Sequence, residues 1–211
     1  IDKGCINACF SYTSKSYQHV EFVGQHFKHY CSNPSEYIKY TEYHDKRTDK
    51  TYSRYCFKTC VNSTFTDYYT KWYKNHIKYI PEDLELTPLN CLIWYIGDGG
   101  LNNSGYSQEI KLSTHCFSKD SQEKILLPQL KIFNPYLVKA DKNRVGDYQY
   151  CIYIPRRNIK DFLEYIGECP FDDYAYKWAY KEYVYGPNRD HTSKEKQICK
   201  MYVNGTSYYA I

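Results

Sequence analysis

Asp98 is the residue of this sequence whose setting most clearly suggests chemistry. It follows an apolar pattern with helical spacing, formed by Leu89, Leu92, Ile93 and Ile96. Thr87 is a favourable N-cap, Pro88 suits the first helical position, and the glycines around Asp98 end the helix. A carboxylate at a helix C-terminus faces the negative end of the helix dipole, and a bound cation would relieve that repulsion. The alternative interpretation is an ordinary turn residue.

A strand is expected after this helix, from Glu109 to Cys116. Its residues alternate between the apolar set Ile110, Leu112, Thr114 and Cys116 and the polar set Glu109, Lys111, Ser113 and His115. The alternation predicts one buried face and one polar face. We therefore expect Lys111, Ser113 and His115 on an exposed, concave face of a sheet.

The remaining elements of this half follow in a simple order. Ser118 is expected to cap a helix that runs to about Phe133, and Pro128 to kink or restart it. The elements predicted after it are strands over Tyr136–Asp141 and Asp147–Ile154 and a helix over Ile159–Ile166 that Gly167 ends.

The residues before Asp98 repeat this order. They predict a strand over Cys5–Tyr12, a helix over Ser16–Tyr30, strands over Tyr37–Tyr43 and Tyr52–Cys60, and a helix over Phe65–Tyr73. The segment Ser14–Gln18 is also similar to Ser118–Gln122. The repeated order predicts an α+β fold of two pseudo-repeated αββαββα halves, over residues 1–79 and 80–185.

The repeat also predicts that the sequence is incomplete at both ends. Shifted back by the offset between Ser14 and Ser118, the counterpart of Asp98 precedes Ile1, so the first half is expected to lack its opening helix and acid. Residues 186–211 are expected to form a linker and a partial helix-turn-helix, because a capped helix ends at Gly205 and another begins shortly afterwards.

Composition excludes few classes of protein. The net charge of +4 is too small to indicate a partner by itself. The 10 cysteines include no CxxC pair, and no secretion signal is recognisable, which favours reduced thiols in an intracellular protein of unspecified compartment. No apolar run approaches the ~18 residues of a membrane span, so no membrane partner is expected.

The segment Leu89–Gly100 resembles the second motif of two-motif LAGLIDADG homing endonucleases, in its tryptophan-containing form. Further landmarks in the same order resemble that family, namely Trp72-Tyr73, Ile80-Pro81, Leu86-Thr87-Pro88, Leu112–Phe117, Ile166-Gly167 and Tyr176-Lys177-Trp178. The resemblance covers residues 5–180. The sequence departs from the family pattern where Leu92, Ile93 and Trp94 replace small residues, and in lacking a first motif.

The resemblance implies a sequence-specific endonuclease that makes metal-dependent double-strand breaks at a long target site and promotes intron or intein mobility. The implied cofactor is Mg²⁺ or Mn²⁺, bound by Asp98 with a backbone oxygen of Gly97 or Gly99. Lys177 and His115 are the other candidates for the catalytic centre. The alternative is a non-catalytic nucleic-acid-binding protein, or an intron-splicing maturase, on the same fold.

In that family each half presents an antiparallel sheet to the DNA major groove. The polar strand faces that the resemblance assigns to double-stranded DNA comprise Lys111, Ser113, His115, Gln149, Cys151 and Tyr153, with Arg54 and Lys58 in the first half. Intron RNA is a second partner to consider. A protein with two motifs is expected to act as a monomer, and one with a single motif as a homodimer.

Overall fold

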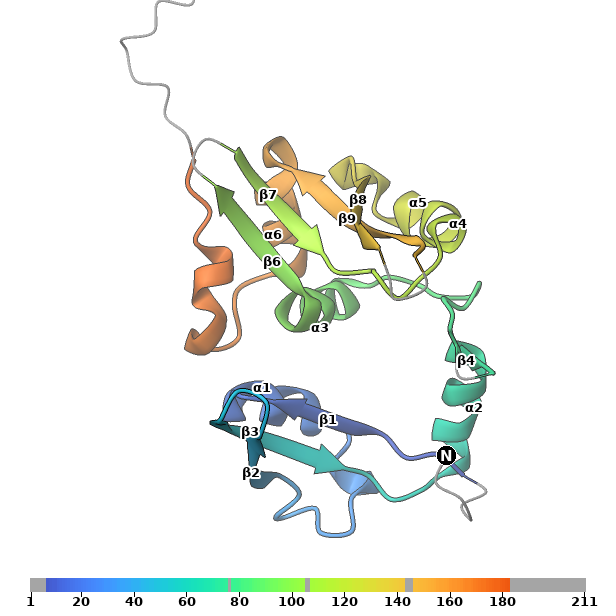
Figure 1. The fold of residues 1–211 in the computed structure, drawn as a ribbon, viewed down its shortest axis with the longest axis vertical. Helices are drawn as coiled ribbons and strands as arrows, with labels where there is room; N and C mark the ends of the chain where they lie inside the picture. Colours follow the sequence, from blue (N-terminus) through green and yellow to red (C-terminus); the bar gives the residue numbers. More distant parts are fainter. Residues whose placement is uncertain (1–6, 76, 105–106, 143–145, 183–211) are drawn as a thin grey trace, which may run out of the picture. The chain divides into compact units, whose positions relative to one another are not determined.

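The computed structural model describes residues 7–75, 77–104, 107–142 and 146–182 (Figure 1). The chain divides into one compact unit that ends at Tyr180 and a second that begins at Lys181. The predicted partial helix-turn-helix over 192–211 lies outside the described residues. Among the residues that are described, no helix has the length and apolar character needed to cross a membrane.

The first half of the compact unit has a three-stranded antiparallel sheet in the order β1-β3-β2. Its elements are β1 (Ser11–Ser14), α1 (Tyr17–Gly24), the 3-10 turn η1 (Lys28–Tyr30), β2 (Lys39–Asp45), β3 (Lys50–Lys58) and α2 (Ser63–Trp72). Val20 and Val23 of α1 pack on Phe57 of β3 to form a small core. A short hairpin, β4 (Tyr73–Lys74) and β5 (Ile77–Lys78), follows α2.

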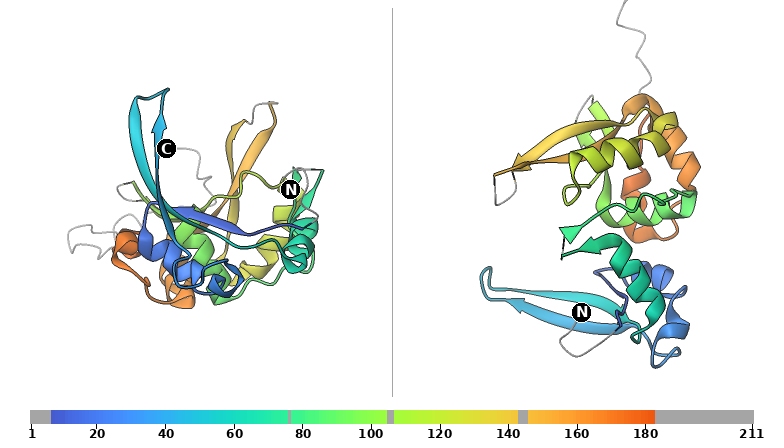
Figure 2. Two further views of the ribbon diagram at one scale, coloured as in Figure 1. Left: turned by 90° about the horizontal axis from the view of Figure 1, so that it is seen from below. Right: turned by 90° about the vertical axis from the view of Figure 1, so that its right-hand side faces the viewer.

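The second half has a four-stranded antiparallel sheet in the order β6-β7-β9-β8. Its elements are α3 (Pro88–Asp98), β6 (Gly99–Ser104), β7 (Ser107–Leu112), α4 (Lys119–Ser121), the π-helical turn η2 (Gln122–Leu126), α5 (Leu127–Gln129), η3 (Lys131–Phe133), β8 (Tyr136–Lys142), β9 (Tyr148–Pro155), η4 (Arg156–Asn158), α6 (Ile159–Ile166) and η5 (Asp172–Trp178). The structure is thus α+β with antiparallel sheets, as predicted. In each half the long hairpin extends past the helices that pack on its own sheet (Figure 2).

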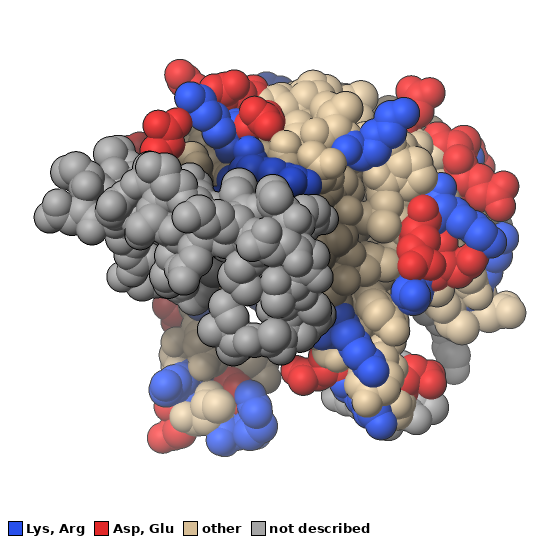
Figure 3. All heavy atoms as spheres, turned by 90° about the horizontal axis from the view of Figure 1, so that it is seen from above, with Lys and Arg blue, Asp and Glu red and all other residues tan. Residues whose placement is uncertain are grey.

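The larger core lies between the second sheet and its helices. Ile110 and Leu112 of β7 and Ile152 and Ile154 of β9 are fully buried, and α3 and α6 pack against them. The predicted alternation is therefore confirmed along the length of β7. On the face of the molecule drawn in Figure 3, Lys and Arg are interspersed with Asp and Glu, in keeping with the small net charge.

The two sheets share a topology. The order β1-β3-β2 matches β7-β9-β8, and Tyr12 pairs with Phe57 as Leu112 pairs with Ile152. Ser16 and Ser118 cap the helices that follow β1 and β7, so the equivalent of Ser118 is Ser16 and not Ser14. Within residues 7–75, nothing corresponds to α3 and β6.

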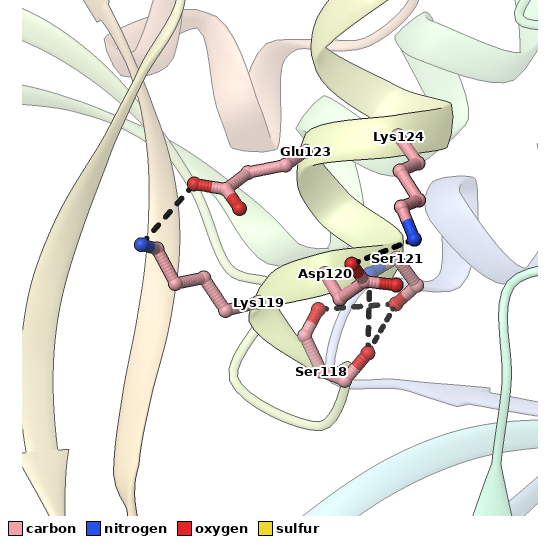
Figure 4. A network of polar contacts seen from close by, with 6 residues as sticks. All are labelled: Ser118, Lys119, Asp120, Ser121, Glu123 and Lys124. Carbon is pink, nitrogen blue, oxygen red and sulfur yellow. Dashed lines mark hydrogen bonds and ion pairs between the residues drawn. The ribbon is translucent and has the colours of Figure 1, made fainter.

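The helix after β7 begins as predicted. The hydroxyl of Ser118 accepts a hydrogen bond from the backbone N–H of Ser121, and two exposed ion pairs, Lys119–Glu123 and Asp120–Lys124, follow along the first turns (Figure 4). The helix then widens into η2 and ends in 3-10 geometry, because Pro128 lacks the N–H that a regular helix needs there.

Three predicted elements were too long. Cys5 and Ile6 lie outside the described residues; from Asn7 on, the first strand begins only at Ser11, since the N–H groups of Ala8 and Phe10 bond to threonine side chains. The helix predicted to reach Tyr30 breaks after Gly24, where short-range turn bonds replace the helical ones.

The strand predicted to reach Cys116 ends at Leu112. The N–H of Phe117 bonds back to Thr114 in a turn, which leaves Cys116 exposed rather than buried.

Candidate active site

Helix α3 places a carboxylate at its exposed end. Thr87 and Asn90 form a reciprocal capping box at its start, with Pro88 at the first position, and Gly99 is the C-cap. The buried residues are Cys91, Leu92, Tyr95 and Ile96. The predicted apolar stripe was thus partly wrong, because Leu89 in the first turn is 47% exposed while Tyr95 is fully buried.

Gly99 lets the chain turn directly from α3 into β6. A Cβ at this position would lie 2.7 Å from the carbonyl oxygen of Tyr95 and 2.8 Å from its Cα, closer than side-chain carbons approach backbone. Gly100, its neighbour, would meet nothing. Only the first of these glycines is needed for packing.

Asp98 lies at the edge of a hollow of about 250 Å³ on the second sheet. The other residues that line it are Gly99, Gly100, Leu101, Asn102, Lys111 and Ser113. The backbone N–H of Ser113 donates to the carbonyl oxygen of Asp98 over 3.1 Å, and Lys111 pairs with Gly100 across the strands. A carboxylate, a lysine and a hydroxyl from separate elements therefore surround one small space.

The side chain of Lys177 contacts the backbone of Gly99, one of the residues that line this hollow. Its side chain is buried, and its ammonium group donates to the carbonyl oxygens of Tyr95, Ile96 and Gly99 at 3.2, 2.6 and 2.6 Å. These carbonyls belong to the last turn of α3 and its cap, where backbone donors run out; the Tyr95 carbonyl also accepts from the N–H of Gly99. Burial lowers the pKa of Lys177, while the negative charge of Asp98 acts in the opposite direction.

A network of hydroxyls and one imidazole, from β1 and α1 of the first half and η5 of the second, lies near the same end of α3. The Tyr12 hydroxyl lies 2.7 Å from Nε2 of His19, and Nδ1 of His19 lies 3.3 Å from the hydroxyl of Tyr174. Tyr174 in turn bonds to the hydroxyl of Ser14 over 3.2 Å. A Cβ built on Gly97 would stand 3.7 Å from the Tyr12 oxygen. This network was not predicted from the sequence, because its members are separated by up to 160 residues.

The buried setting of the network shifts its ionisation. Burial raises the pKa of Tyr12 to about 12, with smaller contributions from Tyr174 and Asp98. Burial also lowers the pKa of His19 to about 4, assisted by the positive charge of Lys177. At neutral pH both groups are therefore uncharged hydrogen-bonding groups.

His115, predicted near the catalytic centre, does not line the hollow around Asp98. Its Nε2 lies 2.9 Å from the sulfur of Cys151, and its carbonyl oxygen accepts from the side chain of Gln149 over 3.1 Å. Cys151, expected on the DNA side, is only 1% exposed, because His115 covers it.

The other predicted DNA-side residues lie on the two sheets. Lys111 and Tyr153 are paired across β7 and β9. Lys111, Ser113 and His115, predicted to be exposed, are partly exposed, each with intermediate burial. Arg54 and Lys58 are exposed on β3, on the face opposite buried Phe57, and Arg54 donates to the Thr41 hydroxyl over 3.2 Å.

Residues 2–162 of the sequence match the LAGLIDADG DNA endonuclease family. The chain belongs to this family. Its structure is similar to that of the homing endonuclease I-WcaI bound to its DNA recognition sequence, with a TM-score of 0.67, 21% identity, and coverage of 85% of this chain and 79% of that chain. At this identity the likeness concerns the fold.

Two relatives of this LAGLIDADG chain are longer than the region they share with it. An uncharacterized protein of Methanocaldococcus jannaschii is 26% identical over 164 residues, which are 78% of this chain and 62% of that protein. The cytochrome b mRNA maturase bI2 of Debaryomyces hansenii is 31% identical over 101 residues, which are 46% of this chain and 36% of the maturase. The chain therefore spans about two thirds or less of the relatives it matches.

The residues at the end of the LAGLIDADG helix suit a hard divalent cation. Within the described ranges no three His, Cys, Asp or Glu side chains gather into a metal-binding group, so Asp98 is the one carboxylate lining the hollow. Mg²⁺ keeps several waters and commonly takes one or two protein carboxylates together with substrate phosphates, which matches this donor set. Of the two predicted backbone ligands, Gly99 lines the hollow but its carbonyl accepts from Lys177, and Gly97 does not line it.

Proposed function

We propose that this chain is a sequence-specific DNA endonuclease that makes metal-dependent double-strand breaks at a long target site and so promotes the mobility of an intron or intein. The supporting observation is the position of Asp98, on the open end of the motif helix in a hollow shared with Lys111. The helix dipole disfavours a carboxylate at this end, yet Asp98 is exposed and lines the hollow, where its carboxylate is open to a cation from solvent.

The residues of the hollow have separate roles in this proposal. Asp98 binds the cation. When bound, Mg²⁺ or Mn²⁺ supplies Lewis-acid activation at the scissile phosphate. Lys111 contributes positive charge facing the phosphate, and Ser113 orients the turn that carries Asp98 through its backbone N–H. Lys177 acts from below as a positioning residue, because its ammonium group is engaged by carbonyls of α3.

The two sheets are proposed to read duplex DNA. An antiparallel ribbon fits the major groove, where base pairs are distinguished by their edges. Lys111, Gln149 and Tyr153 would contribute on the second sheet and Arg54 and Lys58 on the first. His115 would support Gln149 rather than act at the scissile phosphate, given the bonds it makes.

The proposal is tested by selecting duplexes from a randomised library for binding to the 211-residue chain and assaying the selected pool for cleavage. We expect cleavage with Mg²⁺ or Mn²⁺ and none with EDTA, and we expect Asp98→Asn to bind the pool but not cut it. Asp120→Asn, a change of an exposed carboxylate on α4, is the matched control. Cleavage by Asp98→Asn at the rate of the parent chain would contradict the proposal.

An intron-splicing maturase is the second candidate, favoured by the 31% identity to the maturase of Debaryomyces hansenii. A maturase need not cut DNA and so need not use Asp98. If splicing of a host intron is stimulated equally by the parent chain and by Asp98→Asn, and neither cuts DNA, the maturase function replaces the endonuclease.

A further inference from the structure

The segment that joins the two halves has an unusual composition. Between Tyr68 and Pro81 the sequence contains five aromatic residues and three lysines and no acid. They are Tyr68, Tyr69, Trp72, Tyr73 and Tyr79, and Lys71, Lys74 and Lys78. This segment forms the end of α2 and the β4–β5 hairpin. Aromatic residues interleaved with basic ones are typical of nucleic-acid-binding surfaces.

The structure leaves most of these rings open to solvent. Tyr68 is 61% exposed, Tyr79 is 42% exposed and Tyr73 is 36% exposed. Tyr69 and Tyr73, one helical turn apart, stack with their centroids 5.0 Å apart and their planes 13° from parallel. The hairpin supports this arrangement, because the N–H of Tyr79 donates to the carbonyl of Trp72 over 2.7 Å. The tyrosine rings are therefore partly exposed on a hairpin that is held to α2 by a backbone hydrogen bond.

Two lysines lie directly beside these rings. The Lys74 ammonium is 5.6 Å from the centroid of Tyr79, and the Lys78 ammonium is 5.8 Å from Trp72 and 5.1 Å from Phe117. Lys71 pairs with Asp83 over 2.6 Å, so its charge is largely offset. Positive charge thus lies over one face of these rings, at 5.1–5.8 Å from their centroids.

We propose that this linker surface, formed by Tyr69, Tyr73, Lys74, Lys78 and Tyr79, binds a single-stranded nucleic acid segment. An aromatic ring stacks on the face of a base, and that face is accessible only when the base is unpaired. Duplex DNA presents base edges instead, which suits the sheets and not this hairpin. The absence of acids from Tyr68 to Pro81 favours a polyanion over a protein partner. The proposal does not depend on Asp98 or on cleavage.

The test measures binding of the full chain to three labelled probes by fluorescence anisotropy: a short oligouridylate, a short oligothymidylate and a random duplex. We expect Tyr73→Ala/Tyr79→Ala to bind the single strands about tenfold more weakly and the duplex as before. Tyr73→Phe/Tyr79→Phe keeps both rings and should bind all probes like the parent chain. Lys74→Gln/Lys78→Gln should weaken single-strand binding and reduce its dependence on salt.

Tyr40→Ala/Tyr43→Ala is the matched control, since it removes two exposed tyrosines from β2 of the first sheet. It should weaken duplex binding and spare the single strands. The proposal is overturned if the parent chain binds neither single strand, or if the linker variants lose duplex binding to the same extent. The two single-strand probes show whether the ribose hydroxyl matters. The endonuclease proposal is tested by a different measurement, the cleavage of DNA by the parent chain and by Asp98→Asn, so the two proposals can fail independently.

Discussion

The ammonium group of Lys177 lies 2.6 Å from the carbonyl oxygen of Gly99, the residue that follows Asp98. It also donates to Tyr95 and Ile96, so one lysine from η5 satisfies three carbonyls at the end of α3. These carbonyls carry the negative end of the helix dipole. A cation placed there offsets the repulsion that Asp98 would otherwise meet, which explains how the fold tolerates a carboxylate at this position.

Replacement of Lys177 should therefore destabilise the protein. Lys177→Met fills a similar volume but removes the donor to the Ile96 and Gly99 carbonyls and one of two donors to that of Tyr95, and we expect a loss of about 2 kcal/mol in the free energy of unfolding. Urea denaturation measures this loss. Lys131→Met, at an exposed position of η3, should change stability by less than about 0.5 kcal/mol. Equal stability of the two variants would contradict the capping role of Lys177.

The turn after Asp98 should require glycine at position 99 but not at position 100. In Gly99→Ala the new Cβ meets the backbone of Tyr95, and we expect a loss of about 1–3 kcal/mol together with loss of metal-dependent cleavage. Gly100→Ala adds the same methyl group one residue later, where nothing lies within 4 Å. Thermal unfolding of both variants decides the matter; similar melting temperatures would show that Gly99 is not constrained.

His19 should make stability depend on pH. The pKa of His19 is about 4 in the folded chain and 6.5 without burial. As pH falls below 6.5 the unfolded chain takes up a proton that the folded chain refuses until about pH 4, so stability decreases across this window, by up to about 3 kcal/mol. Above pH 6.5 the contribution is fully present.

The comparison variant is His19→Gln, which keeps hydrogen bonds near Tyr12 and Tyr174 but does not titrate. The difference in unfolding free energy between it and the parent chain should shrink as pH is lowered from 6.5 to 4. A difference that stays constant with pH would mean that the pKa of His19 is the same in the folded and unfolded chain.

Local signals in the sequence predicted the elements that carry the site. The bounds of α3 and α6 follow from caps and glycines that lie within a few residues of each helix. Hydrophobic alternation predicted which residues of β7 are buried, since that pattern depends only on neighbours along one strand. Strand β6 (Gly99–Ser104) was not predicted, and it is the pairing of its Gly100 with Lys111 that brings Lys111 next to Asp98.

Contacts between residues far apart in the sequence could not be predicted in this way. The bonds of Lys177 to α3 and of His19 to Tyr174 join residues that no periodicity relates. Cys151 lies on the strand face opposite Ile152, as predicted, but it is buried. Alternation assigns a strand face and says nothing of what covers it; here the segment after β7 brings His115 next to the sulfur. The extent of β7 was overestimated for a similar reason, as a turn to Thr114 interrupts an otherwise regular pattern.

Binding to duplex DNA should weaken as salt increases. Each phosphate contact made by a lysine or arginine contributes about −0.9 to the slope of log K against log salt. Arg54→Ala and Lys111→Ala should each make that slope less steep by about one contact, whereas Lys131→Ala should not change it. Titrations of duplex binding at several salt concentrations measure the slopes. An affinity that does not vary with salt would exclude an interface dominated by phosphate contacts.

The products of cleavage should reveal how two strands are cut. A double-strand break has two scissile phosphates, and each needs its own metal-binding centre. In the parts of the chain that the structure describes, α3 is the one helix that ends in such an acid. A monomer of this chain is therefore expected to nick a plasmid carrying the selected target, and linear product should form only as the protein concentration approaches that of dimerisation. Agarose gels of nicked and linear plasmid over a range of protein concentrations test this expectation. Addition of excess Asp98→Asn should then convert linear product back to nicked product, because mixed dimers contain one working centre. Linearisation that is independent of concentration and unaffected by the variant would place a second acid within the same chain.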